Sequence, residues 1–200
     1  MDLCAARVGY RTVEGYNPTP SLQMSKGTAT HAVIEAKLLD PALLLTPAGI
    51  KDLWAKVLVD EYGLDLSSMG PKDLIKETVF DIYEAVAAWD TVVKPTLPAI
   101  VEVEVTRFRP LGVLPDGRAV WMHATPDAVG ADGAFFDWKT TGWSWKAGKA
   151  DHGYQNKTYP WVWHVDEGLV DFTYWVFDWK KGEWVSHLVQ TEADVRMAAM

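Results

Sequence analysis

The sequence predicts an α+β fold in which a mainly helical N-terminal part precedes a mixed sheet flanked by helices. Apolar residues recur at helical spacing up to about residue 95, and beyond it their period changes to two. One further helical segment separates the later strands, as expected for a sheet that is covered by helices. The 200 residues are predicted to form a single domain, helical over 1–95 and with its sheet core over 96–200.

Three helices are predicted in the first half. The first helix is predicted over residues 28–39. It begins after Gly27, is rich in Ala, Leu and Glu, and is followed by a proline. Residues 47–62 carry an apolar stripe after a Thr-Pro start, which is typical of a helix N-terminus. Residues 71–89 repeat the helical spacing, and the two prolines of 93–98 favour an extended connector.

Strands dominate the prediction for the second half. An antiparallel meander is expected over residues 100–140, because an alternating strand at 100–108, a second segment at 119–130 and a returning strand at 134–140 are separated by turns at 114–117 and 131–134. The elements expected after it are a helix at 153–165, strands at 171–179 and 183–189, and a final helix that begins with a capping box from Thr191 to Asp194.

Composition and charge limit the functional classes. Hydrophobic residues at 48% and charged residues at 23% are typical of a globular chain. No stretch approaches the roughly 20 apolar residues of a membrane-spanning helix, and the start lacks the apolar core of a secretory signal. We therefore expect a cytoplasmic protein without a membrane partner. The net charge of −8 argues against a surface that is basic throughout, although a local basic cleft stays compatible with DNA.

Cys4 is the single cysteine, which excludes an internal disulfide, a cysteine zinc site and an iron–sulfur cluster. Any metal site must therefore be built from carboxylates and histidine. Such hard ligands suit Mg²⁺ or Mn²⁺.

Asp127 and the segment Asp137-Trp138-Lys139 form the most informative pattern. Alternation along a strand places Asp137 and Lys139 on one face, and a hairpin can bring Asp127 beside Asp137. Two neighbouring carboxylates repel each other unless a cation joins them. A lysine next to such a cation can orient a water that attacks a phosphodiester. The alternative interpretation makes Asp127 a turn residue and Lys139 a solvated strand end.

Four short motifs occur in order along the chain: Gly27 to His31, Thr125-Pro126-Asp127, Asp137-Trp138-Lys139-Thr140, and Gln155 to Tyr159. This ordered set resembles the RecB-type branch of the PD-(D/E)XK nucleases, which includes phage exonucleases and CRISPR adaptation nucleases. The resemblance spans about residues 27–165. It implies a restriction-endonuclease-like sheet and a nuclease that acts on DNA ends in recombination or repair. A phage origin, with the host cytoplasm as location, fits this branch.

The resemblance also implies a role for each motif residue. Lys139 would position the attacking water, and hydrolysis would leave a 5′-phosphate. Gln155 and Tyr159 would steady the site and contact the DNA strand. The implied catalytic residues are Asp127, Asp137, Lys139, Gln155 and Tyr159. The implied ligands of Mg²⁺ or Mn²⁺ are His31, Asp127, Asp137 and the backbone carbonyl of Trp138.

Several neighbouring residues have two interpretations. An acidic residue before the first aspartate is common in this branch, and either Glu102 or Glu104 could fill that place. Glu35, one helical turn after His31, is either a supporting residue or a surface charge. The loop around residues 143–146 could stack bases or clasp the sheet. The DNA-binding candidates are Trp143, Trp145, Lys146 and Lys157.

The chain departs from the branch in lacking the cysteines of an iron–sulfur cluster and in placing a proline before Asp127.

Two alternatives to a nuclease belong to other classes. One is a catalytically silent module of the same fold that holds DNA ends for a recombination protein. The other is a sheet that binds sugars or small ligands through some of its eleven tryptophans.

Overall fold

The computed structural model describes residues 19–142, 145, 155–163 and 169–192. The chain divides into two compact units, of which the first comprises Met1–Ala32 and Leu45–Tyr83 and the second Val33–Leu44 and Glu84–Met200. None of the helices in the described ranges combines the length and the apolar character that crossing a membrane would require.

The first unit contains helix α3 (Pro47–Tyr62), a short 3₁₀ helix at Leu66–Met69, and most of helices α2 (Leu22–Leu39) and α4 (Lys72–Ala88), whose C-terminal turns belong to the second unit. Helix α3 has the predicted bounds. Its first turn is capped by Thr46, whose side chain accepts from the Gly49 N–H, and Gly63 ends it with a φ of 65°.

The predicted start of the first helix was too late. Helix α2 begins at Leu22, so Gly27 lies inside it rather than before it. Tertiary contacts explain the longer helix, since buried Lys26 forms an ion pair with Asp81 at 2.5 Å. The side chain of buried Ser25 also accepts a hydrogen bond from the indole of Trp54.

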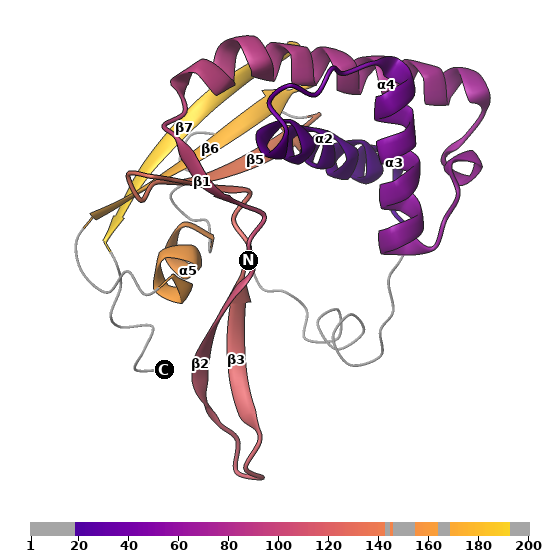
Figure 1. Ribbon diagram of the computed structural model, residues 1–200. Helices are drawn as coiled ribbons and strands as arrows, with labels where there is room; N and C mark the ends of the chain where they lie inside the picture. Colours follow the sequence, from indigo (N-terminus) through magenta and orange to yellow (C-terminus); the bar gives the residue numbers. More distant parts are fainter. Residues whose placement is uncertain (1–18, 143–144, 146–154, 164–168, 193–200) are drawn as a thin grey trace. The chain divides into compact units, whose positions relative to one another are not determined.

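The second unit is built on a five-stranded mixed sheet with the order β1-β4-β5-β6-β7 (Figure 1). Strands β5 and β6 are parallel, and the other neighbouring pairs are antiparallel. The strands of this sheet are β1 (Ile100–Val103), β4 (Ala128–Gly130), β5 (Phe135–Thr141), β6 (Leu169–Asp178) and β7 (Glu183–Glu192). The predicted class, a mixed sheet with helices, is confirmed.

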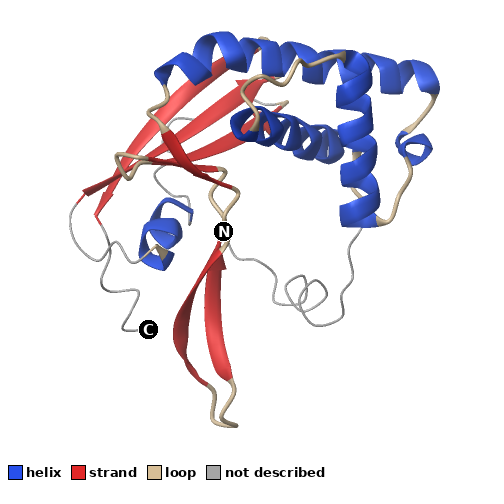
Figure 2. Cartoon of the chain, viewed as in Figure 1, coloured by secondary structure: helices blue, strands red, loops and turns tan. Residues whose placement is uncertain are grey.

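The predicted meander over residues 100–140 was wrong in one respect. Strands β2 (Arg107–Val113) and β3 (Ala119–Ala124) pair only with each other and form a separate two-stranded ribbon (Figure 2). The single strand expected at 100–108 is broken, because Glu104 adopts a left-handed φ of 50° after the end of β1. The ribbon therefore leaves the plane of the main sheet.

Each face of the main sheet has its own aromatic core. On one face, Phe135, Phe172 and Tyr174 pack with Tyr159 of α5 (Gln155–Val162). On the other face, the ring of Trp138 meets Trp89 edge-on, with centroids 5.8 Å apart. Trp184 also donates from Nε1 to the carbonyl of Ala85 at 2.8 Å. Most of the described tryptophans thus serve packing, as expected for indole rings.

The connector predicted to be extended is instead helical. Residues Trp89–Val93 form a π-helical turn and Lys94–Thr96 a 3₁₀ turn, because Trp89 and Val93 are buried and hold the chain against the sheet. Strand β7 runs to Glu192, so Thr191 belongs to a strand and not to a helix cap. The rest of the predicted final helix lies outside the described residues.

Trp89→Ala should lower the free energy of unfolding by about 3–5 kcal/mol, because the removed ring is fully buried against Trp138. The matched control is Trp121→Ala, since that indole is 55% exposed and its loss should cost less than about 1 kcal/mol. Urea unfolding followed by circular dichroism measures both values. Equal losses in the two variants would contradict the described packing.

Candidate metal centre

Three acidic residues continue the register of three neighbouring strands. Val103 of β1 pairs with Ala128 of β4, and Ala128 pairs with Phe136 of β5. One step further along these pairings lie Glu104, Asp127 and Asp137. Side chains directly opposite each other on paired strands lie close together. The sheet therefore aligns three carboxylates in a row across β1, β4 and β5.

Glu104 and Asp127 are joined through their backbones. The N–H of Glu104 donates to the carbonyl of Asp127 at 3.2 Å. Among the described non-glycine residues, only Glu104 has a positive φ. A left-handed conformation costs such a residue on the order of 1 kcal/mol, and strain of this kind concentrates at functional sites. The strained backbone therefore marks Glu104 as a candidate functional residue.

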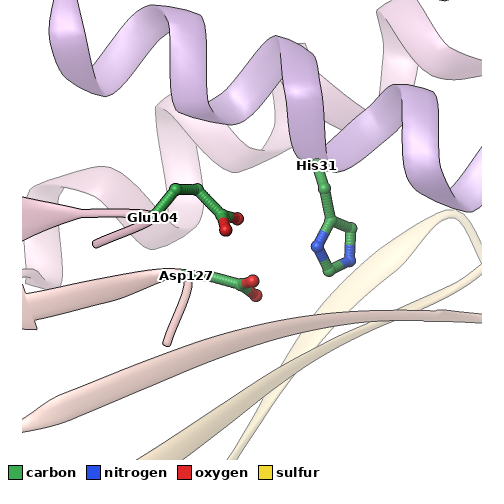
Figure 3. A group of neighbouring side chains, drawn as sticks. All are labelled: His31, Glu104 and Asp127. Carbon is green, nitrogen blue, oxygen red and sulfur yellow. The ribbon is translucent and has the colours of Figure 1, made fainter. Parts of the chain in front are cut away.

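A histidine completes this arrangement. Helix α2 continues without a break from His31 into the part of the helix that belongs to the second unit. One ring nitrogen of His31 and one carboxylate oxygen each of Glu104 and Asp127 lie within 4.8 Å of one another. Figure 3 shows the three side chains extending toward a common point. Asp127 is buried, and the other two are half-buried.

These three donors fit a divalent cation. Two carboxylates this close repel each other unless positive charge lies between them. Carboxylate oxygens suit Mg²⁺ and Mn²⁺, and an imidazole is also a ligand for transition metals. The donor set thus agrees with the predicted metal class, and two of its members, His31 and Asp127, are predicted ligands.

Asp137 has a different set of partners. Its side chain is almost fully buried, and Oδ2 lies 2.5 Å from Nζ of Lys139. Its Oδ1 accepts from Nε2 of Gln155 at 2.9 Å. The alternation argument for Asp137 and Lys139 agrees with this ion pair. Asp137 is not in the group formed by His31, Glu104 and Asp127.

Asp127 is linked to the strand of Asp137 by a buried hydrogen bond. Its Oδ2 accepts from the backbone N–H of Trp138. This bond orients the Asp127 carboxylate and connects the group of His31, Glu104 and Asp127 to the Asp137–Lys139 pair. The role predicted for the Trp138 carbonyl stays a prediction, whereas the N–H of the same residue has this definite partner.

Gln155 and Tyr159 lie one turn apart on α5, and both lie close to Asp137. Gln155 donates from Nε2 to the hydroxyl of Tyr159 at 2.8 Å, in addition to its bond with Asp137. Burial raises the pKa of Tyr159, and the nearby charge of Asp137 raises it further. Tyr159 therefore keeps its proton at neutral pH and can donate it to an acceptor.

The two candidate glutamates, Glu102 and Glu104, have different partners. Glu102 forms an ion pair with Arg107, and its other oxygen accepts from Nε1 of Trp163 at 3.3 Å. Glu104 faces His31 and Asp127. Strand alternation would have placed both glutamates on one face, but β1 ends between them. Glu35 is half-buried on α2 and lies outside the three-residue group.

The structure describes two of the four DNA-binding candidates, Trp145 and Lys157. Trp145 is half-buried, with its ring centroid 6.1 Å from those of Tyr174 and His187, which agrees with a clasp on the sheet. Lys157 is exposed on α5. Trp143 and Lys146 lie outside the described residues.

Glu104→Gln should weaken Mn²⁺ binding by on the order of 10-fold or more, because it removes the charge of one donor. Glu102→Gln is the matched control and should leave the affinity unchanged, since Glu102 pairs with Arg107 instead. Calorimetric titration of the purified chain with MnCl₂ gives the affinities. If the two variants bind Mn²⁺ equally well, the assignment of Glu104 is wrong.

No protein-family model and no curated protein matches this chain. The crystal structure of SSO0001 is a solved structure with a detectable likeness, at 12% sequence identity and a TM-score of 0.38. The match covers 92% of this chain and 73% of that one. A likeness at this level carries no argument about function, so the functional proposal rests on the site itself.

Proposed function

We propose that this protein is a Mg²⁺- or Mn²⁺-dependent deoxyribonuclease of the PD-(D/E)XK type that hydrolyses phosphodiester bonds at DNA ends. The observation that carries the proposal is the buried Asp137 carboxylate in contact with the Lys139 ammonium, next to the group of His31, Glu104 and Asp127. A buried carboxylate needs compensating charge. Here the compensation comes from a lysine that is itself 30% exposed and can reach a phosphate.

His31, Glu104 and Asp127 would hold the divalent ion. When bound, such an ion supplies Lewis acidity at a phosphoryl oxygen and at an attacking water. The hydrogen bond from the Trp138 N–H keeps the Asp127 carboxylate in one orientation before any ion arrives. A preorganised ligand loses less conformational entropy on binding.

Lys139 would supply positive charge where the phosphate accumulates negative charge during hydrolysis. Its ammonium lies against Asp137, so its position is defined rather than free in solvent. Gln155 holds the other oxygen of Asp137 and thereby fixes the carboxylate. The neutral hydroxyl of Tyr159, bonded to the same amide, is a donor available for a phosphate oxygen.

Because the chain is acidic overall, binding of DNA would depend on the charges near the site. At −8 the protein as a whole repels a polyanion. Binding of DNA therefore has to depend on the divalent ion, on Lys139 and on local basic groups, and it should weaken with salt. This dependence fits an enzyme that engages DNA at one site rather than along an extended basic surface.

Asp137→Asn and Lys139→Ala should each reduce cleavage of linear DNA by about 100-fold or more, because each removes one half of the central ion pair. Matched linear and circular DNA, incubated with Mg²⁺ or Mn²⁺ and with chelator, report activity, metal need and end dependence. Asp171→Asn and Lys181→Ala are controls of the same chemistry at exposed positions, and they should cleave like the wild type.

Unchanged cleavage by folded Asp137→Asn and Lys139→Ala proteins would refute the catalytic assignment. Wild-type protein that binds DNA ends but never cuts them, with either ion, would favour the alternative of a silent end-binding module that acts with a recombination partner. Preferential loss of linear over circular DNA is the result expected for an exonuclease.

A further inference from the structure

A small pocket lies on the face of the main sheet that carries Asp137 and Lys139. Thr141 follows Lys139 by two positions on β5, and Val176 of β6 pairs with Lys139. Side chains two positions apart on a strand point to the same face, as do those of directly paired residues. Thr141 and Val176 both line the pocket, which has a volume of about 110 Å³ and reaches His187 on β7. The pocket is therefore adjacent to the proposed catalytic pair.

A buried carboxylate lines this pocket at the end of β6. Asp178 is 7% exposed, and its Oδ1 accepts a hydrogen bond from the backbone N–H of Lys180 at 2.9 Å. Its Oδ2 has no hydrogen bond or ion pair with any residue that the structure describes. A buried carboxylate oxygen without a donor is energetically costly. The pocket therefore suits a ligand that brings an N–H group to Oδ2, and it does not suit an anion.

Two aromatic rings also border the pocket. The indole of Trp145 lies beside the imidazole of His187, with centroids 6.1 Å apart and ring planes 32° apart. Such surroundings favour a flat ligand that can lie against a ring. A volume of 110 Å³ corresponds to about four water molecules, which suits one six-membered ring better than two fused rings.

The cation at the rim has a partner of its own. Lys181 is 59% exposed, and its Nζ lies 3.5 Å from Oε1 of Glu183. Its ammonium is thus engaged at the surface, and we assign it no contact with the ligand. The recognition depends instead on Asp178 and on the rings.

Among the bases of DNA, cytosine fits these properties best. It is a single ring with an N4 amine, from which an aspartate can accept a hydrogen bond. Thymine has the same size but carries a carbonyl at the corresponding position, so it would present an acceptor to Oδ2. Adenine and guanine also carry amines, but each has two fused rings.

We propose that this pocket binds a cytosine of the DNA substrate, with the N4 amine donating to Oδ2 of Asp178 and the ring lying against Trp145. Asp178 pairs with Thr141, which lies about 7 Å along β5 from Lys139 at about 3.3 Å per residue. A DNA strand rises about 3.4 Å per nucleotide, so the cytosine would lie about two nucleotides from the reacting phosphate. This position rests on the proposed nuclease function, whereas the binding of cytosine requires no cleavage.

Titration of fluorescein-labelled oligodeoxycytidylate and oligothymidylate of about 10 nucleotides tests the pocket, with the full chain in EDTA so that no cleavage occurs. The wild type should bind the cytosine oligonucleotide about 10-fold more tightly. Asp178→Asn keeps an oxygen for the Lys180 N–H but presents an amide donor to the base, so it should remove this preference and favour thymine. Asp171→Asn, the same substitution at an exposed residue of β6, is the control and should retain the wild-type preference.

Two further measurements do not depend on the folding of Asp178→Asn. An oligodeoxycytidylate with dimethylated N4 amines has lost the donor, so the wild type should bind it no better than oligothymidylate. Equal binding of the methylated and unmethylated oligonucleotides would contradict the assigned hydrogen bond. Trp145→Ala should weaken binding of oligodeoxycytidylate by about 10-fold, and Trp145→Phe, which keeps a ring, should retain most of the affinity.

The proposal is overturned if the wild type binds the two unmodified oligonucleotides equally or binds neither of them. It is also overturned if Asp178→Asn keeps the same preference for cytosine as Asp171→Asn. A preference for cytosine in a chain that cuts no DNA with either ion would retain the pocket and reject the nuclease. Cleavage that depends on Asp137 and Lys139, together with equal affinities for the two oligonucleotides, would reject the pocket and retain the nuclease.

Discussion

Asp127 connects the three strands on which the candidate site depends. Its backbone carbonyl accepts from Glu104, and its carboxylate accepts from the N–H of Trp138, so one residue links β1, β4 and β5 where two strand pairings end. These bonds set three carboxylates in a row. Such a row is electrostatically unfavourable unless cations compensate it. Lys139 compensates Asp137 directly. The group of His31, Glu104 and Asp127 has the donors to receive a divalent ion.

The surroundings of this row explain how the charges can be held in place. Aromatic side chains fill both faces of the sheet, with Trp138 packed on Trp89 on one side and Phe135 packed on Phe172 on the other. Close packing restricts the strands to one arrangement. Hydrogen bonds from Gln155 and from the Trp138 N–H then restrict the two aspartate side chains. A site built on strands in this way is more exactly positioned than one built on loops.

Helix α5 contacts both the strand that carries Asp137 and the β2–β3 ribbon. On one side it presents Gln155 and Tyr159 to Asp137, and on the other its Trp161 receives Arg109 of the ribbon.

Local chemistry determined several features without tertiary information. The Thr46 cap, Pro47 and Gly63 set the bounds of α3, and alternation alone put Asp137 and Lys139 on one face. Long-range contacts decided the rest. The left-handed backbone at Glu104 ends β1 and gives Glu104 and Glu102 different surroundings. It accompanies the pairing of β1 with β4 and is not favoured by local propensity. The parallel pairing of β5 with β6 likewise depends on a partner distant in sequence, which periodicity cannot identify.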